Sequence, residues 1–402
     1  MINWLTDYIG TGAFDKVIAT NCEYPVLDVR GLVDKSGNSI EFITEKITQG
    51  LSILDSVPKI VVCCDYGMSR SNSIAAGIIA KKEDKPLSQV VELYFKNIAE
   101  GGVKLDMFNT IFQASVGHKD TSLKNTILVT GASGFLGKSL QKKLITEYKV
   151  IGVNSEKYNL LTNPLSLDIF VKENNISTII HLANPRIYTL NIALGDSLVM
   201  LKNVLELCRI NDIKLIYISS WEVYSGYNTE KILADESLPL FPRGSYGESK
   251  WLSEQLITQY SKMYGLKYNI IRSSPIYGLD SDKPKFIYNF LNKAKKNETI
   301  TTHKYVNGFP NVDLLHQEDI VDAIEKTINI NGNNVFNIGS GISLNTNEVA
   351  KFIVESLGSK SNIEINHIED FYPNIQMNYS KINSLVGWHP QNNFKDFITN
   401  LI

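Results

Sequence analysis

Two groups of residues in this 402-residue chain have types and spacings that could carry chemistry. In the first, "VVCCDYGMSRS" at 61–71, Cys64 and Arg70 flank five residues directly after an apolar run. A cysteine is a useful nucleophile only as a thiolate, and backbone N–H groups, a helix N-terminus or a nearby cation favour that form. The pattern predicts a strand, a tight loop permitted by Gly67, and a helix whose N-terminal amides point into the loop.

Arg70 and Ser71 would complete an anion site in this loop. Arg70 offers a planar fork that matches two phosphoryl oxygens. Ser71 could donate a hydrogen bond to the sulfur and help it leave once a phosphocysteine forms. Alternatively, the spacing arises by chance and Cys64 is a buried strand cysteine, which is the commonest fate of a free thiol. The order of strand, glycine, arginine, serine and helix favours a phosphate-binding loop.

The second group begins with "TILVTGASGFLG", in which Gly131, Gly134 and Gly137 recur every three residues between a predicted strand and a predicted helix. Glycines at this spacing permit the tight turn, let the backbone approach a pyrophosphate and allow close helix packing. A glycine triplet alone is a weak signal, so a dinucleotide site also needs support from residues further along the chain.

That support comes from "SSWEVY" and "SYGESK". Tyr246 and Lys250 are four positions apart on one face of a predicted helix, so the ammonium is expected to lower the pKa of the phenol. Ser220, at the end of a predicted strand, could hydrogen-bond the reacting oxygen. The tyrosine would then act as general base or acid while a nicotinamide takes or gives hydride.

The elements that must position these residues follow two patterns. Before about residue 115, the sequence predicts short strands and turns through "YPVLDV", the strand "KIVVCC", and helices over 38–54, 70–82, 87–98 and 104–115. From 126 onward, the strands "TILVTG", "KVIGV", "TIIHLA", "KLIYISS" and "YNIIRSS" alternate with helices over 135–147, 164–174, 191–211 and 246–264. This alternation predicts a doubly wound parallel sheet with ligands at the carboxyl ends of its strands.

The polar stretch 116–125 separates the two patterns and indicates a domain boundary. We therefore expect an α/β domain over 1–120 and a second α/β domain over 121–402. The more mixed stretch 280–402 is expected to hold most of a smaller substrate lobe, interleaved with the last sheet strands.

The bulk composition excludes several classes of function. A formal net charge of −2 gives no broad basic field, which argues against nucleic acid or an anionic membrane surface as the main partner. No apolar run approaches the roughly 20 residues that span a bilayer, and the first residues lack signal-peptide features, so we expect a cytoplasmic protein. The cysteines lack metal-ligand spacing, so reduced thiols and no metal are expected; they are Cys22, Cys63, Cys64 and Cys208.

The segment "CDYGMSRS" resembles the C-x5-R-S/T signature of the protein tyrosine and dual-specificity phosphatases, over roughly residues 1–118. The resemblance implies Cys64 as nucleophile, with Arg70 and Ser71 in catalysis. It also implies a set of phosphate-binding residues in the loop, namely Asp65, Tyr66, Gly67, Met68, Ser69 and Arg70. One departure is that the residue before the nucleophile is Cys63, where the superfamily usually has histidine.

The phosphatase resemblance also implies an upstream aspartate as general acid. Asp28 and Asp34 both qualify by position. Asp34 lies 30 positions before Cys64, just ahead of a predicted helix start where the family's acid loop would run, so we prefer it.

The motifs of the second half resemble the extended short-chain dehydrogenases/reductases, in the branch of nucleotide-sugar epimerases, dehydratases and reductases. They occur in family order between about 125 and 400, as "TGASGFLG", "HLAN", "ISSWEVYS", "YGESK", "IIRSSPIYG", "VFNIGSG" and "LVGWHP". The resemblance implies a Rossmann domain, an NAD(P)(H) cofactor and catalysis by Ser220, Tyr246 and Lys250. The cofactor-binding residues that it implies are Gly131, Ser133, Gly134, Phe135, Leu136, Gly137, Asn154, Leu160, Ala183, Tyr246 and Lys250.

Two departures from this family bear on its ligands. Asn154 stands where an NAD-preferring site usually carries an acidic residue for the ribose 2′-OH. Because Asn154 has no carboxylate to repel a 2′-phosphate, and Ser155 and Lys157 are near in the sequence, NADP(H) is slightly preferred. Val312 stands where family members often carry an arginine for the nucleotide diphosphate of the substrate.

Together these features predict a bifunctional cytoplasmic enzyme, a phosphatase joined to an NAD(P)-dependent enzyme of sugar modification, in the biosynthesis of an unusual glycan sugar. Its expected partner is a sugar phosphate or nucleotide sugar, and a homodimer is plausible because many relatives pair. Two alternatives stay open for the first domain: it binds phosphate or a phosphoprotein as a regulatory module, or it is a protein phosphatase. The sequence does not choose between epimerisation, dehydration and reduction.

Overall fold

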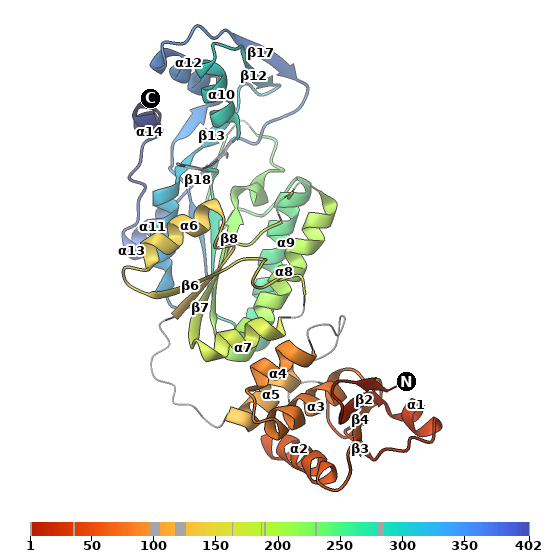
Figure 1. Cartoon of the computed structure of the whole chain (residues 1–402). Helices are drawn as coiled ribbons and strands as arrows, with labels where there is room; N and C mark the ends of the chain where they lie inside the picture. Colours follow the sequence, from red (N-terminus) through yellow and green to blue (C-terminus); the bar gives the residue numbers. More distant parts are fainter. Residues whose placement is uncertain are drawn as a thin grey trace. The chain divides into compact units, whose positions relative to one another are not determined.

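The chain divides into two compact units, residues 1–124 with 158–175 and residues 125–157 with 176–402 (Figure 1). The computed structural model describes residues 2–34, 37–95, 105–116, 126–162, 164–185, 187–188, 190–229, 231–279, 281 and 285–401. Most of the stretch expected to join the domains, residues 117–125, lies outside the described residues.

The first unit is built on a four-stranded sheet in the order β1, β2, β4, β3. The strands are β1 Asn3–Trp4, β2 Ile9–Ala13, β4 Ile60–Cys64 and β3 Val26–Asp28. β2 and β3 both run parallel to β4, and β1 is antiparallel to β2. Every residue of β4 is buried, as expected for an apolar strand covered on both faces. The sheet therefore brings Cys64 to the carboxyl end of an inner strand.

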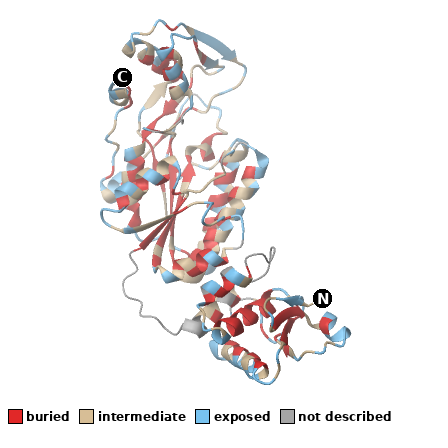
Figure 2. Ribbon diagram, in the orientation of Figure 1, coloured by how far each residue is buried: buried red, intermediate tan, exposed pale blue. Residues whose placement is uncertain are grey.

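The helices of this unit are α1 Phe14–Ala19, α2 Ile40–Leu54, α3 Ser69–Lys82, α4 Leu87–Tyr94, α5 Leu105–Val116 and α7 Leu165–Glu173. α3 contacts β2 and β4 as well as α2, α4 and α5. Its residues Ser69–Ala80 are all buried, so α3 is the central helix (Figure 2). The expected helices over 38–54 and 70–82 are confirmed as α2 and α3. Those over 87–98 and 104–115 are present as α4 and α5, and residues 96–104 lie outside the described part.

α1 corrects the expectation of strands and turns alone before residue 28. This helix has six residues, no side-chain N-cap, and Val17 as its one buried residue. A segment this short shows too few apolar positions for a helical period to be recognised.

The second unit is built on a six-stranded sheet in the order β15, β10, β8, β7, β5, β6, with every neighbouring pair parallel. The strands are β5 Thr126–Thr130, β6 Lys149–Val153, β7 Ile176–His181, β8 Lys214–Ser220, β10 Tyr268–Ser273 and β15 Asn334–Ile338. The predicted doubly wound parallel sheet is confirmed. β5 and β7 are neighbours although β6 separates them in the chain, so the winding reverses there. Ligands of such sheets bind beside that point, at the carboxyl ends of the strands.

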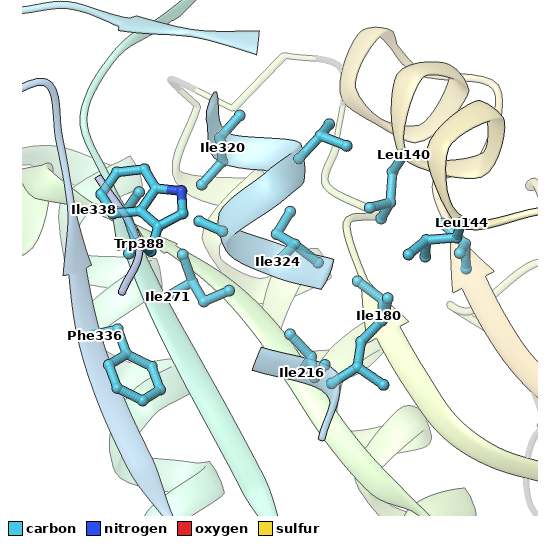
Figure 3. Packing of buried hydrophobic residues seen from close by; sticks show 14 of the residues in the cluster. Leu140, Leu144, Ile180, Ile216, Ile271, Ile320, Ile324, Phe336, Ile338 and Trp388 are labelled. Atoms are coloured by element: carbon cyan, nitrogen blue, oxygen red, sulfur yellow. The ribbon is translucent and has the colours of Figure 1, made fainter. Parts of the chain in front are cut away.

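Helices cover both faces of this sheet (Figure 1). α6 Phe135–Leu144 and α11 Gln317–Ile328 lie on one face, and α8 Asn191–Asn211 and α9 Gly244–Tyr264 lie on the other. Figure 3 shows the core under α6 and α11, where the helical residues Leu140, Leu144, Ile320 and Ile324 meet the strand residues Ile180, Ile216, Ile271 and Phe336. Trp388 joins this core and donates from Nε1 to the Asp319 carbonyl at 3.2 Å. The motif "LVGWHP" thus anchors the C-terminal segment to α11.

Part of the C-terminal third forms a smaller lobe around its own core. The lobe holds α10 Lys285–Lys295, α12 Thr346–Ser356, α14 Phe394–Leu401, and the parallel pair β12 Ile300–Tyr305 and β17 Ile363–Ile368. Shorter pairs are β9 Ile232–Ala234 with β18 Ile375–Met377, β13 Asn311–Asp313 with β16 Ser343–Asn345, and β11 Ile276–Tyr277 with β14 Leu315–His316. α11, β15 and α13 Ser380–Val386 come from the same third of the chain but belong to the main sheet and its covering layer.

Among the described residues, no helix combines the length and apolar character needed to cross a membrane. The same residues place no group of three or more His, Cys, Asp or Glu side chains where a metal ion could be held.

Candidate functional site

The first candidate site is the loop between β4 and α3. The Cys64 Sγ lies 3.4 Å from the Ser71 Oγ and accepts a hydrogen bond from the Gly67 amide at 3.2 Å. Backbone amides of Tyr66, Met68 and Ser71 also hydrogen-bond the sulfur. Burial opposes ionisation of the thiol, but these hydrogen bonds outweigh it and lower the pKa of Cys64. The loop therefore favours the thiolate, the form that a nucleophile needs.

The neighbouring cysteine lies in a different environment. Cys63 lies on the opposite face of β4, where it packs with Val17 and Val61. Burial raises the pKa of Cys63 to about 12. Although histidine is missing at this position, the pKa of Cys64 is still lowered, because the loop amides and Ser71 supply the hydrogen bonds.

Gly67 lets the loop close against β2. Its φ is +72°, in the left-handed region that favours glycine. A Cβ at this position would lie 2.4 Å from the Ala13 nitrogen, so no other residue fits without a shift of the backbone. Tyr66 and Met68, on either side, are 77% and 52% exposed and form the rim of the loop.

Arg70 reaches across the first unit from α3. Its Nη1 donates to the carbonyls of Arg30 and Leu32, at 3.1 and 3.0 Å. Its Nη2 forms an ion pair with Asp65. Its Nε is buried and has no hydrogen-bond acceptor among the described residues, and the Asp34 Oδ1 lies 3.8 Å away. Part of the guanidinium thus remains available for an anion.

The two aspartates proposed as general acid lie in different surroundings. Asp34 is beside the loop, because its carboxylate approaches the Nε of Arg70. The Asp28 carboxylate instead accepts hydrogen bonds from the backbone and the guanidinium of Arg30. The side-chain hydrogen bond from Arg30 lowers the pKa of Asp28. A carboxyl held ionised in this way is a poor proton donor, so the geometry favours Asp34.

The second candidate site lies at the carboxyl ends of β5, β7 and β8. Gly131 opens the turn with a φ of +68°, and a Cβ there would lie 2.8 Å from the Ala183 nitrogen. The Gly134 amide donates to the Gly131 carbonyl at 3.0 Å. A Cβ on Gly137 would lie 2.4 Å from that carbonyl oxygen, so α6 approaches the turn this closely only at a glycine. Ser133 and Gly134 are exposed at the start of α6, an arrangement that fits a pyrophosphate.

The other residues predicted to bind the cofactor are more scattered. Phe135 and Leu136 are half-buried at the start of α6. Asn154 follows β6, and its Oδ1 accepts a hydrogen bond from the Lys157 amide at 3.2 Å. Leu160 belongs to the segment 158–175, which groups with the first unit, whereas the glycine turn belongs to the second. The cofactor roles of these residues stay predictions.

Ser220, Tyr246 and Lys250 lie together. Tyr246 and Lys250 are one turn apart in α9, and the Lys250 Nζ is 5.5 Å from the centre of the Tyr246 ring. That Nζ also donates to the Ile218 carbonyl of β8 at 2.9 Å. Ser220 ends β8, and its hydroxyl hydrogen-bonds the phenol of Tyr246. The helix spacing and the strand end thus assemble the three side chains that the sequence picked out.

The expectation of a lowered pKa for Tyr246 is wrong, because burial outweighs the neighbouring ammonium of Lys250. Burial, and then the carboxylate of Glu222, raise the pKa of Tyr246. Burial also lowers the pKa of Lys250 to about 8, although Glu254 and Glu222 act in the opposite direction. Desolvation outweighs the charge interactions here because these polar groups are enclosed. The tyrosine therefore holds its proton as a general acid would.

Glu222 is a candidate that the sequence reasoning missed. It lies in the 3₁₀ turn Trp221–Tyr224, directly after β8. α9 approaches it closely, since a Cβ on Gly247 would lie 2.6 Å from the Glu222 carbonyl oxygen. Burial raises the pKa of Glu222 to about 7, with Lys250 acting in the opposite direction. A carboxyl that titrates near neutrality next to Tyr246 is suited to proton transfer. The sequence feature that could have identified Glu222 is its position two residues after Ser220 in "SSWEVY".

A buried ion pair connects the elements of this site. Arg272 of β10 and Glu254 of α9 pair at 2.7 Å, and both side chains are almost fully buried. Glu254 also accepts a hydrogen bond from the Ser219 hydroxyl at 2.6 Å, and Arg272 donates to the Tyr224 hydroxyl at 2.6 Å. The network therefore links the end of β8 and the following turn to α9.

Residues 127–339 match the NAD dependent epimerase/dehydratase family. The chain belongs to this family. The match includes the glycine turn, the end of β8 and all of α9, and residues 1–126 lie outside it. The residues present fit the NAD that this family uses, because the chain has glycines at the turn. A Cβ on Gly131 or Gly137 would collide with neighbouring backbone atoms.

The similar proteins are enzymes of nucleotide-sugar metabolism by name. The "Putative UDP-glucose 4-epimerase" of Methanocaldococcus jannaschii is 29% identical over 301 residues, which cover 69% of this chain and 97% of that protein. The human dTDP-D-glucose 4,6-dehydratase is 24% identical over 318 residues, covering 69% of this chain and 88% of that protein.

Solved structures resemble the fold of the second unit. The UDP-glucose 4-epimerase of Thermus thermophilus, in complex with NAD, has a TM-score of 0.61 at 20% identity and covers 68% of this chain and 96% of its own. RMD from Pseudomonas aeruginosa, complexed with NADPH, has a TM-score of 0.59 at 21% identity and covers 68% of this chain and 97% of its own. At these identities, the likeness shows a shared fold.

Proposed function

We propose that the second unit is an NAD(P)-dependent enzyme that epimerises, dehydrates or reduces a nucleotide- or phosphate-linked sugar. The supporting observation is the meeting of Ser220, Tyr246 and Lys250 beside the glycine turn in a member of this family. The names of the relatives, which mention UDP-glucose and dTDP-glucose, support a sugar substrate. Val312 is buried in the lobe core and offers no cation to the substrate, so a diphosphate would need another partner.

In this proposal Tyr246 carries the proton of the redox step. A sugar hydroxyl held between Tyr246 and Ser220 would exchange its proton with the phenol while the serine hydrogen-bonds the same oxygen. Lys250 is protonated below about pH 8, and its charge would stabilise the tyrosinate that forms. A nicotinamide, when bound, supplies hydride transfer.

Glu222 would supply a second acid–base group. With a pKa of about 7, it can hold or release a proton near neutral pH. Simple reduction of a ketone needs one proton donor, whereas loss of water from a sugar needs a second group to move another proton. Of the three proposed reactions, epimerisation, dehydration and reduction, Glu222 therefore favours dehydration.

The test of this function is the Tyr246→Phe variant, assayed by mass spectrometry on nucleotide sugars and sugar phosphates with NAD(H) and NADP(H). Turnover should fall by about 10²–10⁴-fold, because the ring stays but the transferable proton is lost. Cofactor binding should stay largely intact. Tyr264→Phe, at an exposed tyrosine of the same helix, is the matched control. Near-normal turnover by Tyr246→Phe would show that the assignment is wrong.

For the cofactor we propose NADP(H) or mixed preference. Asn154 presents no carboxylate to a 2′-phosphate, and Lys157 lies in the same turn. Titration of the protein with NAD(H) and NADP(H), followed by fluorescence, tests this. Binding of NAD(H) far more tightly than NADP(H) would contradict it.

For the first unit we propose hydrolysis of phosphate monoesters by a separate domain over 1–120. The supporting observation is the lowered pKa of Cys64 inside a ring of amides, with the buried Nε of Arg70 beside it. The thiolate would attack phosphorus, the leaving oxygen would take a proton from Asp34, and water would then hydrolyse the phosphocysteine. Acting on the same sugar as the second unit, this enzyme would serve the making of an unusual glycan sugar in the cytoplasm.

Assays of the reduced protein on aryl phosphates, sugar phosphates and phosphopeptides separate the possibilities for this unit. Preference for sugar phosphates supports the proposal, and preference for phosphopeptides supports a protein phosphatase. Phosphate binding without release of phosphate from any of them would leave a regulatory binding module as the better description.

A further inference from the structure

We infer that Asp65 is a specificity-determining residue of the Cys64 loop: its carboxylate competes with phosphate for Arg70, so the loop selects singly phosphorylated, otherwise uncharged ligands over polyanions. This inference rests on the proposed anion site of the loop and adds the class of ligand that the site accepts.

The competition follows from how Arg70 is bonded. The Arg70 side chain is 11% exposed, and its Nη1 is already used by the carbonyls of Arg30 and Leu32. An oxyanion bound in the bidentate manner would take the remaining pair of donors, Nε and Nη2. The Nε is buried and has no acceptor within the described residues, whereas Nη2 is ion-paired with Asp65. A phosphate bound in this way therefore competes with the Asp65 carboxylate for the N–H groups of Nη2.

Asp65 is able to move away but remains at the mouth of the site. Its side chain is 51% exposed, and its one hydrogen bond among the described residues is the one to Arg70. Asp65 directly follows Cys64, so the charge of Asp65 stays near any ligand bound in the Cys64 loop. Arg30 is another cation near Asp65, but its guanidinium already bonds Asp28 at 2.8 Å and lies 3.4 Å from the centre of the Phe14 ring.

Within the part of the chain that the structure describes, the rim of the loop offers no compensation for a highly charged ligand. Tyr66 and Met68, which form the exposed rim, are uncharged. Each further negative charge on a ligand would therefore meet the Asp65 carboxylate, which disfavours binding by several-fold or more per contact. A monoester on a neutral carrier meets the least repulsion.

The test uses the full chain with Cys64→Ser, which separates binding from turnover, and calorimetric titration with inorganic phosphate and with pyrophosphate. A further variant, Arg70→Met in the same Cys64→Ser background, lacks the guanidinium. The binding heat that is lost in this variant is the heat of anion binding to the loop. Adding Asp65→Asn or Asp65→Ser should tighten phosphate binding by about fivefold and pyrophosphate binding by more, since a competing and repelling charge is removed. Asp65→Glu, which keeps the charge, should bind as weakly as the parent.

Asp55→Asn is the matched control, because it removes one exposed carboxylate of the same unit outside the loop. If Asp65→Asn and Asp65→Ser leave both affinities unchanged, or Asp55→Asn produces the same gain, the role of Asp65 is overturned while the anion site stands. If no variant binds phosphate at all, both the role of Asp65 and the proposed phosphatase site are overturned.

Discussion

Two ionisable side chains, Cys64 and Glu222, show how local surroundings set the chemistry available to each unit. Cys64 and Cys63 are neighbours in β4, yet hydrogen bonds from the loop amides lower the pKa of the first, and burial raises the pKa of the second to about 12. Glu222 is half-buried, and desolvation raises its pKa to about 7 although Lys250 acts in the opposite direction. For Cys64 the hydrogen bonds outweigh burial, whereas for Cys63 and Glu222 burial is the larger influence.

The raised pKa of Glu222 predicts a pH-dependent stability. Its pKa rises from 4.5 to about 7 on folding, so the folded state holds a proton that the unfolded state has released. The stabilisation from this proton is complete below about pH 4.5 and is lost as pH rises through 7. Glu222→Gln should therefore gain stability relative to the parent as pH rises, by at most about 3 kcal/mol at pH 8.

Urea unfolding of both proteins at pH 5 and pH 8 measures this difference. Glu248→Gln, at an exposed glutamate of α9, serves as control and should show no such gain. A Glu222→Gln difference that is the same at both pH values would contradict the burial of a neutral carboxyl there.

At the scale of elements, both sites use the same arrangement, a buried parallel strand followed by a glycine turn and a helix. β4 leads through Gly67 into α3, and β5 leads through Gly131 into α6. Both glycines have a positive φ and lie against another backbone segment, so the helix N-terminus is brought close to the strand end. Amides gathered in this way favour an anion, which is a thiolate in the first unit and, in the proposed function, the pyrophosphate of the cofactor in the second.

Gly137 predicts the cost of opening this arrangement. Gly137→Ala places a Cβ 2.4 Å from the Gly131 carbonyl oxygen, so α6 must move away from the turn. We expect a loss of about 2 kcal/mol in stability and at least tenfold weaker binding of the nicotinamide cofactor. Denaturant unfolding and cofactor titration measure the two effects.

The control is Gly195→Ala in α8, where no atom lies within 4 Å of the added Cβ. Alanine there should stabilise the protein by about 0.5–1 kcal/mol, because glycine is a poor helix former. Equal behaviour of the two variants would mean that the approach of α6 to the turn is unimportant.

At the scale of the whole molecule, the chain holds two units, each with its own sheet and its own buried residues. The first carries the cysteine loop on β4 and α3, and the second carries the tyrosine and lysine on α9. Chemistry built on separate cores is expected to respond separately to mutation.

This organisation predicts independent loss of the two proposed activities. Cys64→Ser should eliminate phosphate release, because a serine alkoxide is much harder to form than a thiolate, and should leave sugar turnover within about twofold. Tyr246→Phe should do the reverse. Both rates are measured on the same preparations, and loss of both activities in either variant would contradict independent sites.

Much of the fold and of both sites could be predicted because the signals are local. The five residues between Cys64 and Arg70, the glycine spacing before α6, and the four-residue step from Tyr246 to Lys250 each describe one loop or one helical turn. Strand and helix periods are similarly local, so the parallel sheet followed from the alternation of apolar segments. The six-residue α1 was too short to recognise, and no individual helix or strand was predicted in the mixed stretch 280–402, which holds α10 to α14.

The tertiary structure decided what depends on segments far apart in the chain. Asp34 lies beside Arg70, whereas Asp28 bonds Arg30, and Glu222 lies close to α9. The pKa of Tyr246 is raised where the helical spacing alone predicted a lowered one, because burial and Glu222 come from the packing of other elements around it. Spacing along the chain thus determined which groups could meet. Their charge depends on desolvation and on partners from other segments, and only the packed structure sets these.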